Sequence, residues 1–408
     1  MPSLLSINTY NYRRGGSDVV FLEHDAMFAD LGWRTASMAM HHPKNYPSKW
    51  DKYFVREIEF GNSYGVFQKA LMAGKVIYSL EAKNKVSKLL DDFSADVAHA
   101  HCIYHHLSPS VLVELKRRNI PVVMTAHDLK LACPSYKMVN RLGICERCKN
   151  GNFLHTIKHR CVRGSLAVSA LVALESTVHR KFGLYKDNLD MVVAPSIFMR
   201  NKLIEWGWSG DQIRHIPNYV HVDSYEPRYQ PGSYFVYFGR LQLDKGVATV
   251  IRAASKANVP LQIVGTGPDE EALKTIAEES KGSVIFHGYQ QGESLRTLVS
   301  NSRAVVLASE IYENAPMSVL EGYAMGKPAI GARIGGIPEL IKDTETGLLF
   351  ESGDVDELAD CLAYFSALDN RRVEEMGRQC RDVVTANFCS DIYMSSMLGL
   401  YSDLGVRV

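Results

Sequence analysis

The feature that most constrains this chain is the alternation of short apolar runs with longer segments of helical periodicity. Runs rich in β-branched and apolar residues predict strands at 4–8, 35–40, 96–100, 122–126 and 191–194. The alternation restarts after Pro231 and predicts strands at 233–238, 261–264, 284–286, 304–308 and 328–331. Strands that alternate with helices build parallel sheets from βαβ units. The predicted fold class is therefore α/β.

The spacing of apolar residues also predicts how the chain divides into domains. Helices are predicted at 66–93, 109–118 and 165–182, and the pattern is again helical from 354 to 408. Pro, Gly and polar residues gather between 216 and 232, where periodicity is lost, which is typical of a linker. A chain of 408 residues has the length of two domains. We expect a first domain at 1–220, a second at 221–390, and a terminal helix at 391–408 that could pack back on the first.

Composition excludes several classes of protein. Lys and Arg number 46 against 45 Asp and Glu, a formal net charge of +1, so no overall field would draw the chain to nucleic acid. No run reaches the roughly 20 apolar residues that span a bilayer. The first residues also lack the basic and apolar regions of a signal peptide. We therefore expect no nucleic-acid partner and a cytoplasmic location.

The most specific segment is 309–322, which contains Glu313 and Glu321 eight positions apart. The strand predicted at 304–308 precedes it, and a helix is predicted to begin with Pro316 in its first turn. Glu313 would then lie at the carboxyl end of a strand, where open α/β sheets bind ligands. Two carboxylates at this spacing can accept hydrogen bonds from hydroxyls of two joined rings, and the helix start attracts phosphates. The alternative is an ordinary helix with one dipole-stabilised acid and one surface Glu.

A second candidate site follows the first strand of the second domain. Arg240 and Lys245 bracket a loop there, and a diphosphate needs such cations. The alternative is a solvated turn with two surface cations. Glycine turns that could approach a phosphate occur at 265–267, at 335–336 and at Gly15-Gly16, although such turns are common in α/β proteins.

Four of the eight cysteines cluster in a polar segment that we expect to be an insertion at about 133–161. Cys133, Cys145, Cys148 and Cys161 are separated by eleven, two and twelve residues. Four thiolates complete the tetrahedral shell of a structural zinc ion. The alternatives are reduced thiols or a redox pair, because a C-x-x-C spacing has many uses.

Histidines crowd the end of the strand predicted at 96–100. Alternation places His99 and His101 on one face, and His101 or His105 could contact an acceptor or be an ordinary hydrogen-bonded histidine. Asp354 and Asp356 have a spacing that some metal-dependent enzymes use. Because a helical run follows directly, a helix cap at Asp354 is the better interpretation.

The ordered motifs of the second domain resemble those of the retaining nucleotide-sugar glycosyltransferases of family 4. The motifs are Gly239-Arg240 with Lys245-Gly246, the Gly265–Gly267 turn, and Glu313 spaced to Glu321 before 326–328. The first domain fits more loosely, through Gly15-Gly16 and the strand that ends before His127. The resemblance implies the GT-B architecture, two Rossmann-like domains that face each other across a cleft.

The resemblance also implies roles for individual residues. Arg240 and Lys245 would hold the donor diphosphate, and Glu321 would bind the ribose. Glu313 would contact the transferred sugar, and His127 would lie near its reacting carbon. The implied catalytic residues are His127, Glu313, Arg240 and Lys245. The implied donor-binding residues are Gly15, Gly16, Gly239, Arg240, Lys245, Gly265, Glu313, Asn314, Ala315 and Glu321.

The function implied is transfer of a sugar, with retention, from a UDP- or GDP-linked donor to a glycan or lipid-linked acceptor in surface polysaccharide assembly. The first domain would bind the acceptor, and no catalytic metal would be needed. The basic-edged helix at 165–182 could rest on the inner face of a membrane, although a core helix would show the same pattern. Two alternatives remain open: an epimerase or hydrolase on the same fold, and a non-catalytic sugar-nucleotide-binding protein.

Overall fold

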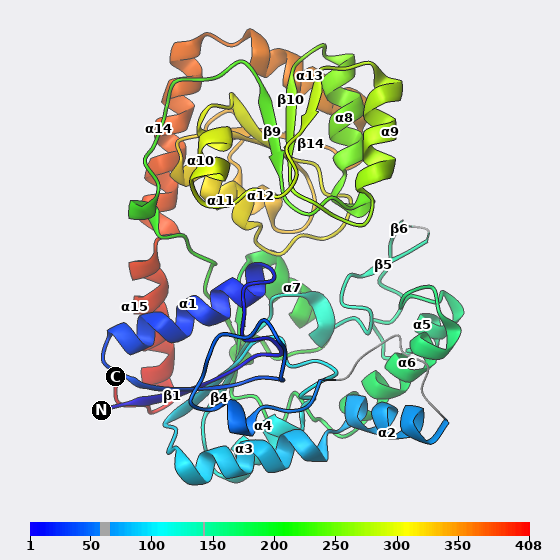
Figure 1. Cartoon of the computed structure of the whole chain (residues 1–408), viewed down its shortest axis with the longest axis vertical. Coiled ribbons are helices and arrows are strands. Elements are labelled where there is room, and N and C mark those ends of the chain that lie inside the picture. The colour runs from blue at the N-terminus through cyan, green and yellow to red at the C-terminus, as the bar shows by residue number, and fades with distance from the viewer. Residues whose placement is uncertain (58–65, 142) are drawn as a thin grey trace. The chain divides into compact units, whose positions relative to one another are not determined.

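A computed structural model of the chain describes residues 1–57, 66–141 and 143–408 (Figure 1). Residue 142 of the expected cysteine-rich insertion and residues 58–65 of the expected first domain lie outside the described residues. The chain forms two compact units. Unit 1 comprises Met1–Pro195, Met199–Ile216 and Met394–Val408, and unit 2 comprises Ser196–Phe198 and Pro217–Tyr393.

Unit 1 is built on a six-stranded parallel sheet in the order β2-β1-β3-β4-β7-β8. Leu5 of β1 pairs with Ala36 on one side and Ala98 on the other. All five residues of β1 are buried, as expected for a central strand covered on both faces. The strands are β1 (Ser3–Ile7), β2 (Arg34–Met38), β3 (Val97–Ala100), β4 (Val122–Thr125), β7 (Met191–Ala194) and β8 (Ile213–His215).

Helices cover both faces of this sheet. Figure 1 shows α1 on one face, with α3 and α4 on the other. A small antiparallel ribbon, β5 (Val139–Asn140) and β6 (Gly143–Ile144), lies in the cysteine-rich segment. The helices that begin in this part of the chain are α1 (Gly16–Asp30), α2 (Val66–Ile77), α3 (Leu80–Asp92), α4 (Ser110–Arg117), α5 (Leu154–Lys158), α6 (Leu166–Lys181) and α7 (Ile197–Glu205).

The single helix expected at 66–93 is wrong, because two helices, α2 and α3, occupy this range. The break lies at Ser79, whose side chain accepts a hydrogen bond from the backbone N–H of Ala82 at 3.1 Å. A serine in this role caps a new helix start. The apolar periodicity continues through both helices and therefore hides the break.

Unit 2 repeats the architecture with a parallel sheet in the order β11-β10-β9-β12-β13-β14. Its strands are β9 (Phe235–Phe238), β10 (Leu261–Val264), β11 (Val284–Phe286), β12 (Ala304–Leu307), β13 (Ala329–Ala332) and β14 (Gly347–Phe350). Its helices are α8 (Val247–Lys256), α9 (Glu270–Ser280), α10 (Gly292–Ser300), α11 (Met317–Ala324), α12 (Ile337–Leu340), α13 (Val355–Ala367) and α14 (Asn370–Asn387). The predicted α/β class with two Rossmann-like sheets is confirmed.

The order of the strands in unit 2 locates a point where ligands bind. The chain moves outward from β9 in one direction through β10 and β11, and then in the other direction through β12, β13 and β14. Doubly wound sheets bind ligands outside the carboxyl ends of the strands at this reversal. The loops after β9 and β12 therefore lie where a ligand is expected to bind.

The end of the chain returns to unit 1. Helix α15 (Ser390–Asp403) carries Tyr401, whose hydroxyl lies 3.0 Å from His24 Nε2 and 2.6 Å from His99 Nδ1.

The cap expected at Asp354 is confirmed, because its carboxylate accepts hydrogen bonds from the backbone N–H groups of Asp356 and Glu357. None of the helices in the described part of the chain is both long enough and apolar enough to cross a membrane.

Candidate active site

Two predicted site residues meet at the strand reversal of unit 2. The Lys245 ammonium lies 2.6 Å from Glu313 Oε1, although 68 positions separate them in the sequence. The Ser309 hydroxyl donates a hydrogen bond to the same oxygen. Both charged side chains are partly buried, with 27% and 14% of their surface exposed. A cation and a carboxylate are thus held together, each with part of its surface open to a ligand.

Arg240 differs from Lys245 in its surroundings. Its carbonyl accepts a hydrogen bond from the Tyr237 hydroxyl at 2.9 Å, which anchors the backbone. Its side chain is exposed and forms no ion pair with any residue that the structure describes. The loop is therefore fixed while the guanidinium remains available to an anion.

Glycines allow the loops at this end of the sheet to touch. Gly265 has φ +138°, and a Cβ placed on it would lie 1.9 Å from the Gly239 carbonyl oxygen. Gly246 has φ +67°, and its Cβ would lie 1.7 Å from the Ala308 carbonyl oxygen. Any side chain at Gly246 or Gly265 would force the loops apart, and Gly239 itself has φ +152°, so the predicted Gly239 and Gly265 have a structural reason to be glycine.

The segment between β12 and α11 is fixed by contacts of its own. Asn314 Oδ1 accepts from the Ser196 hydroxyl at 2.7 Å, and the Ala315 carbonyl accepts from the Asn218 side chain at 3.1 Å. Pro316 is the cap before α11 and does not lie in its first turn, which corrects the expected placement. Glu321 lies one turn inside α11 and is partly buried.

The site residues expected from the first domain lie in unit 1. Gly15 precedes α1 in an extended conformation, φ −162°, and Gly16 is the first residue of that helix. His127 follows β4, and its Nε2 lies 2.8 Å from His101 Nδ1. Burial lowers the pKa of His127 to about 4, so this ring is neutral at pH 7.

His101 and His105 have partners inside unit 1. His101 is fully buried, stacks on the His99 ring at 4.8 Å between centroids, and bonds to His127. These contacts favour the hydrogen-bonded alternative over an acceptor contact for His101. His105 Nδ1 lies 3.3 Å from Glu175 Oε1.

Comparison with known proteins identifies the family. A family model described as Glycosyltransferase Family 4 matches residues 14–224, and one described as Glycosyl transferases group 1 matches residues 226–382. The first of these alone spans half of the chain. The chain belongs to glycosyltransferase family 4. The predicted resemblance and the prediction of an enzyme are both confirmed.

Individual relatives of this family 4 glycosyltransferase agree in length and fold. The N-acetyl-alpha-D-glucosaminyl L-malate synthase of Bacillus anthracis is 24% identical over 96% of this chain and 94% of that protein. The sucrose-phosphate synthase of Thermosynechococcus elongatus has a TM-score of 0.72 at 19% identity, covering 99% of both chains. Anabaena Alr3699/HepE, solved in complex with UDP, has a TM-score of 0.67 at 16% identity, covering 98% of this chain and 100% of that chain. Both likenesses extend over nearly the whole chain and support the expected GT-B architecture.

The four clustered cysteines of this glycosyltransferase surround one small cavity. Cys133, Cys145, Cys148 and Cys161 all line it, and its volume is about 10 Å³. Burial, followed by the neighbouring thiols, raises the pKa of Cys161 to about 11. Across the described ranges, no three His, Cys, Asp or Glu side chains are arranged as they stand to hold a metal ion. The zinc site therefore remains a prediction.

One residue at the centre of this glycosyltransferase's unit 2 site was not predicted from the sequence. Ser309 begins the segment 309–322, and its hydroxyl donates a hydrogen bond to Glu313. Its position directly after the strand end, four residues before Glu313, is the signal that could have identified it. Ser309, Lys245 and Glu313 form one cluster, while Arg240 and Glu321 lie on adjoining segments of the same unit.

Proposed function

We propose that this glycosyltransferase moves a sugar from a nucleoside diphosphate to a glycan or lipid-linked acceptor, with retention at the anomeric carbon. The observation that carries the proposal is the Lys245–Glu313 pair at the strand reversal of unit 2, beside the exposed Arg240. Nucleotides bind at such reversals. Support for a UDP-linked donor comes from HepE, which has been solved with UDP and with UDP-glucose.

The chemistry would depend on placed charge. As the bond between the anomeric carbon and the diphosphate oxygen breaks, negative charge grows on the diphosphate. Arg240 and Lys245 would stabilise that charge directly, and stabilisation of developing charge by groups already in place is usually the largest single contribution to catalysis. The leaving phosphate oxygen would accept the proton of the attacking hydroxyl, so no side-chain nucleophile is required. Glu313 would bind hydroxyls of the sugar, and Glu321 those of the ribose.

Unit 1 would supply the acceptor side of the reaction. The neutral ring of His127 can exchange hydrogen bonds with a sugar without adding charge. A lipid-linked acceptor is supported by α6 and its cap residue, where Leu166, Leu174 and Phe182 are each more than half exposed near a basic last turn. Such a surface suits peripheral contact with a membrane. Sedimentation with vesicles should weaken in Leu174→Glu, and unchanged sedimentation would contradict this contact.

The decisive experiment is a donor-turnover assay with and without acceptor. UDP- and GDP-linked sugars are each incubated with the enzyme, first alone and then with a panel of glycans. We expect nucleotide release to depend on one donor and to rise strongly when a glycan is added, with the product anomer the same as the donor's. Equal turnover without any glycan would instead indicate hydrolysis or epimerisation.

We also propose that zinc closes the cysteine-rich segment. Four thiol side chains around one cavity suit the ligand set of a structural zinc site, although the side chains would have to turn toward a common centre. The ion would stabilise a polar segment and take no part in sugar transfer. Elemental analysis of the purified enzyme should find about one zinc per chain. Cys148→Ser should lose it, and a metal-free wild-type enzyme would contradict the proposal.

A further inference from the structure

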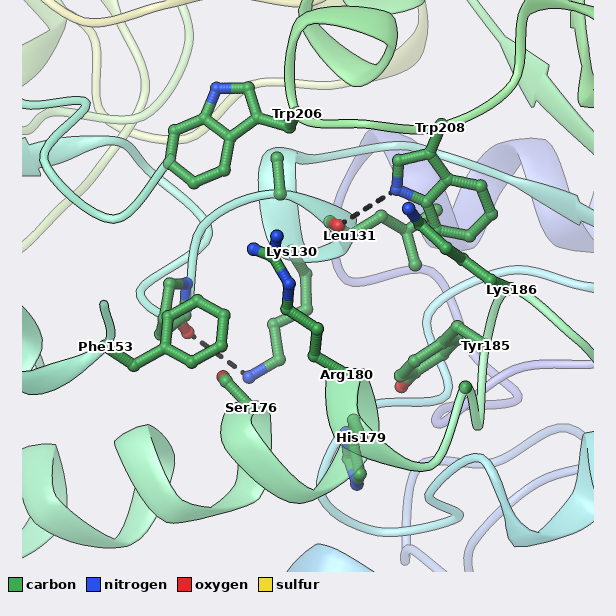
Figure 2. A pocket seen from close by; sticks show the side chains of 13 residues that line it. Lys130, Leu131, Phe153, Ser176, His179, Arg180, Tyr185, Lys186, Trp206 and Trp208 are labelled. Carbon is green, nitrogen blue, oxygen red and sulfur yellow. Dashed lines mark hydrogen bonds between the residues drawn. The ribbon is translucent and has the colours of Figure 1, made fainter. Parts of the chain in front are cut away.

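A second cavity lies wholly inside unit 1, and no cysteine is among its lining residues. Its volume is about 80 Å³, room for several water molecules. It lies among the segment after β4, helix α6, the loop that follows it, and the chain after α7 (Figure 2). The residues that line it are Lys130, Leu131, Ala132, Pro134, Phe153, Ser176, His179, Arg180, Gly183, Tyr185, Lys186, Trp206 and Trp208.

The charge of this cavity is strongly positive. Three lining residues are cations, and none of the described lining residues is Asp or Glu. Lys130 is neutralised, because its ammonium lies 2.9 Å from the buried carboxylate of Glu175. Arg180 and Lys186 have no ion-pair partner among the residues that the structure describes. Two exposed cations at one cavity therefore lack a fixed counter-charge.

The positive charges of Arg180 and Lys186 also repel each other. Burial lowers the pKa of Lys186, the Arg180 charge lowers it further, and the opposing effect of Asp187 is smaller. Figure 2 shows the Arg180 side chain rising from α6 toward the cavity and Lys186 beside Trp208. An anion placed here would meet two cations that repel each other, and binding it would relieve that repulsion.

The remaining lining is aromatic, and it leaves hydrogen-bonding groups unpaired. Trp206, Trp208, Tyr185 and Phe153 all contribute ring surface. The buried Tyr185 hydroxyl and Trp206 indole N–H have no hydrogen-bond partner among the described residues. Unpaired buried polar groups are costly and therefore rare, and a bound ligand that completes them would remove the cost. Aromatic faces with a few polar groups suit the C–H faces and hydroxyls of a sugar ring.

We propose that this cavity binds the anionic group of a sugar substrate, a phosphate or carboxylate carried on a pyranose ring. Arg180 and Lys186 would hold the anion, and the indole rings would hold the sugar. The proposal rests on the proposed function, because it specifies the acceptor as an anionic glycan and assigns its charged part to unit 1.

The test uses the full-length enzyme and tryptophan fluorescence. The chain has four tryptophans, of which Trp206 and Trp208 line the cavity. Glucose 1-phosphate and glucuronic acid should each give a saturable change in emission, and uncharged methyl glucoside should bind at least about tenfold more weakly. Inorganic phosphate should bind more weakly than glucose 1-phosphate, and equal binding would overturn the sugar part of the proposal.

Variants then locate the site. The double variant Arg180→Gln with Lys186→Gln should lose about tenfold or more in affinity for glucose 1-phosphate. Lys88→Gln, which replaces an exposed lysine on α3, should bind like the wild type. If the double variant has a much lower melting temperature than the wild type, Lys186→Gln alone serves, because it leaves Arg180 in place and changes only the side chain that contacts the Gly207 carbonyl. Unchanged affinity in either variant would overturn the inference.

Two further measurements separate this inference from the proposed function and from a membrane. Arg240→Gln, which alters unit 2, should keep the fluorescence response. If Arg240→Gln loses it, the sugar phosphate was bound at the donor loop, so the inference fails while the proposed function gains support. The second measurement uses phosphatidylglycerol vesicles. If the enzyme sediments with them only when Arg180 and Lys186 are present, and glucose 1-phosphate gives no response, the cations belong to a lipid-binding surface and the sugar assignment is overturned.

Discussion

At the scale of single residues, the site of unit 2 depends on one oxygen atom. Glu313 Oε1 accepts from both the Lys245 ammonium and the Ser309 hydroxyl. The sequence placed Glu313 and Lys245 at the carboxyl ends of different strands, and the general rule for α/β sheets predicted that both face a ligand. Their contact could not be predicted, because it depends on how two loops pack after the sheet has formed.

Lys245→Gln should lower turnover by about a hundredfold to a thousandfold, since it removes a fixed charge from the diphosphate. It should also raise the KM for the donor, which a purely structural effect would not do selectively. Steady-state kinetics with the preferred donor gives both values. Lys256→Gln is the matched control, because Lys256 is an exposed lysine of the same unit that pairs with Asp356. Similar losses in both variants would show that the effect is not specific to the site.

Gly246→Ala should destabilise the protein by more than about 1 kcal/mol, because the new Cβ meets the Ala308 carbonyl and the backbone is left-handed, φ +67°. Gly292→Ala has a similar left-handed backbone, φ +57°, but nothing within 4 Å of its Cβ. The difference between the two variants therefore isolates the clash. Denaturant unfolding measures both, and equal values would show that the close approach of the loops adds no cost.

At the scale of elements, four histidines join parts of unit 1 that are distant in sequence. His24 comes from α1, His99 and His101 from β3 and the residue after it, and His127 from the end of β4. The prediction that His99 and His101 share a face is confirmed by their stacked rings. The partner Tyr401 could not be predicted, because 377 positions separate it from His24 and no local pattern links them.

This histidine cluster predicts a pH dependence of stability. Burial lowers the pKa of His24 to about 3 and that of His127 to about 4. The unfolded chain therefore binds more protons than the folded one below pH 6.5, and the free energy of unfolding falls as the pH drops from 6.5 toward 4. Each such histidine contributes up to about 1.4 kcal/mol per pH unit in that window.

Melting curves between pH 7 and pH 5 test this expectation. His24→Gln should show a shallower fall in melting temperature than the wild type, because one buried group no longer resists protonation. His41→Gln, which replaces an exposed histidine, should keep the wild-type slope. Parallel slopes for all three proteins would contradict the assignment.

At the scale of the whole molecule, the sequence predicted two α/β domains joined near 216–232, and the structure has two compact units. That prediction was based on the alternation of strands and helices, which ends before the linker and begins again after it. The assignment of short segments to a unit was not predicted. Ser196–Phe198 belongs to unit 2, although the residues before and after it in the sequence belong to unit 1. Edge strands β8 and β14 were also not predicted. Such details depend on tertiary contacts and leave no periodic signal.

Because the chain has two compact units, we expect two thermal unfolding transitions, and UDP should raise the temperature of only one of them. All four tryptophans lie in unit 1, at positions 33, 50, 206 and 208, so the change in their emission on heating follows the unfolding of that unit. UDP at a hundred times its Kd should stabilise unit 2 by about 2.7 kcal/mol. We expect calorimetry to show a shifted transition while the tryptophan transition stays in place. A shift of the tryptophan transition alone would place the nucleotide in unit 1.

The return of α15 to unit 1 has a consequence for biogenesis. A ribosome must have synthesised Tyr401 before His24 and His99 acquire the hydroxyl they share. Nascent unit 1 therefore remains incomplete until the codon for Tyr401, which follows the whole coding region of unit 2, has been translated. Chaperone demand should be greatest in that interval, and a premature stop codon before Tyr401 should damage the unit whose synthesis began first.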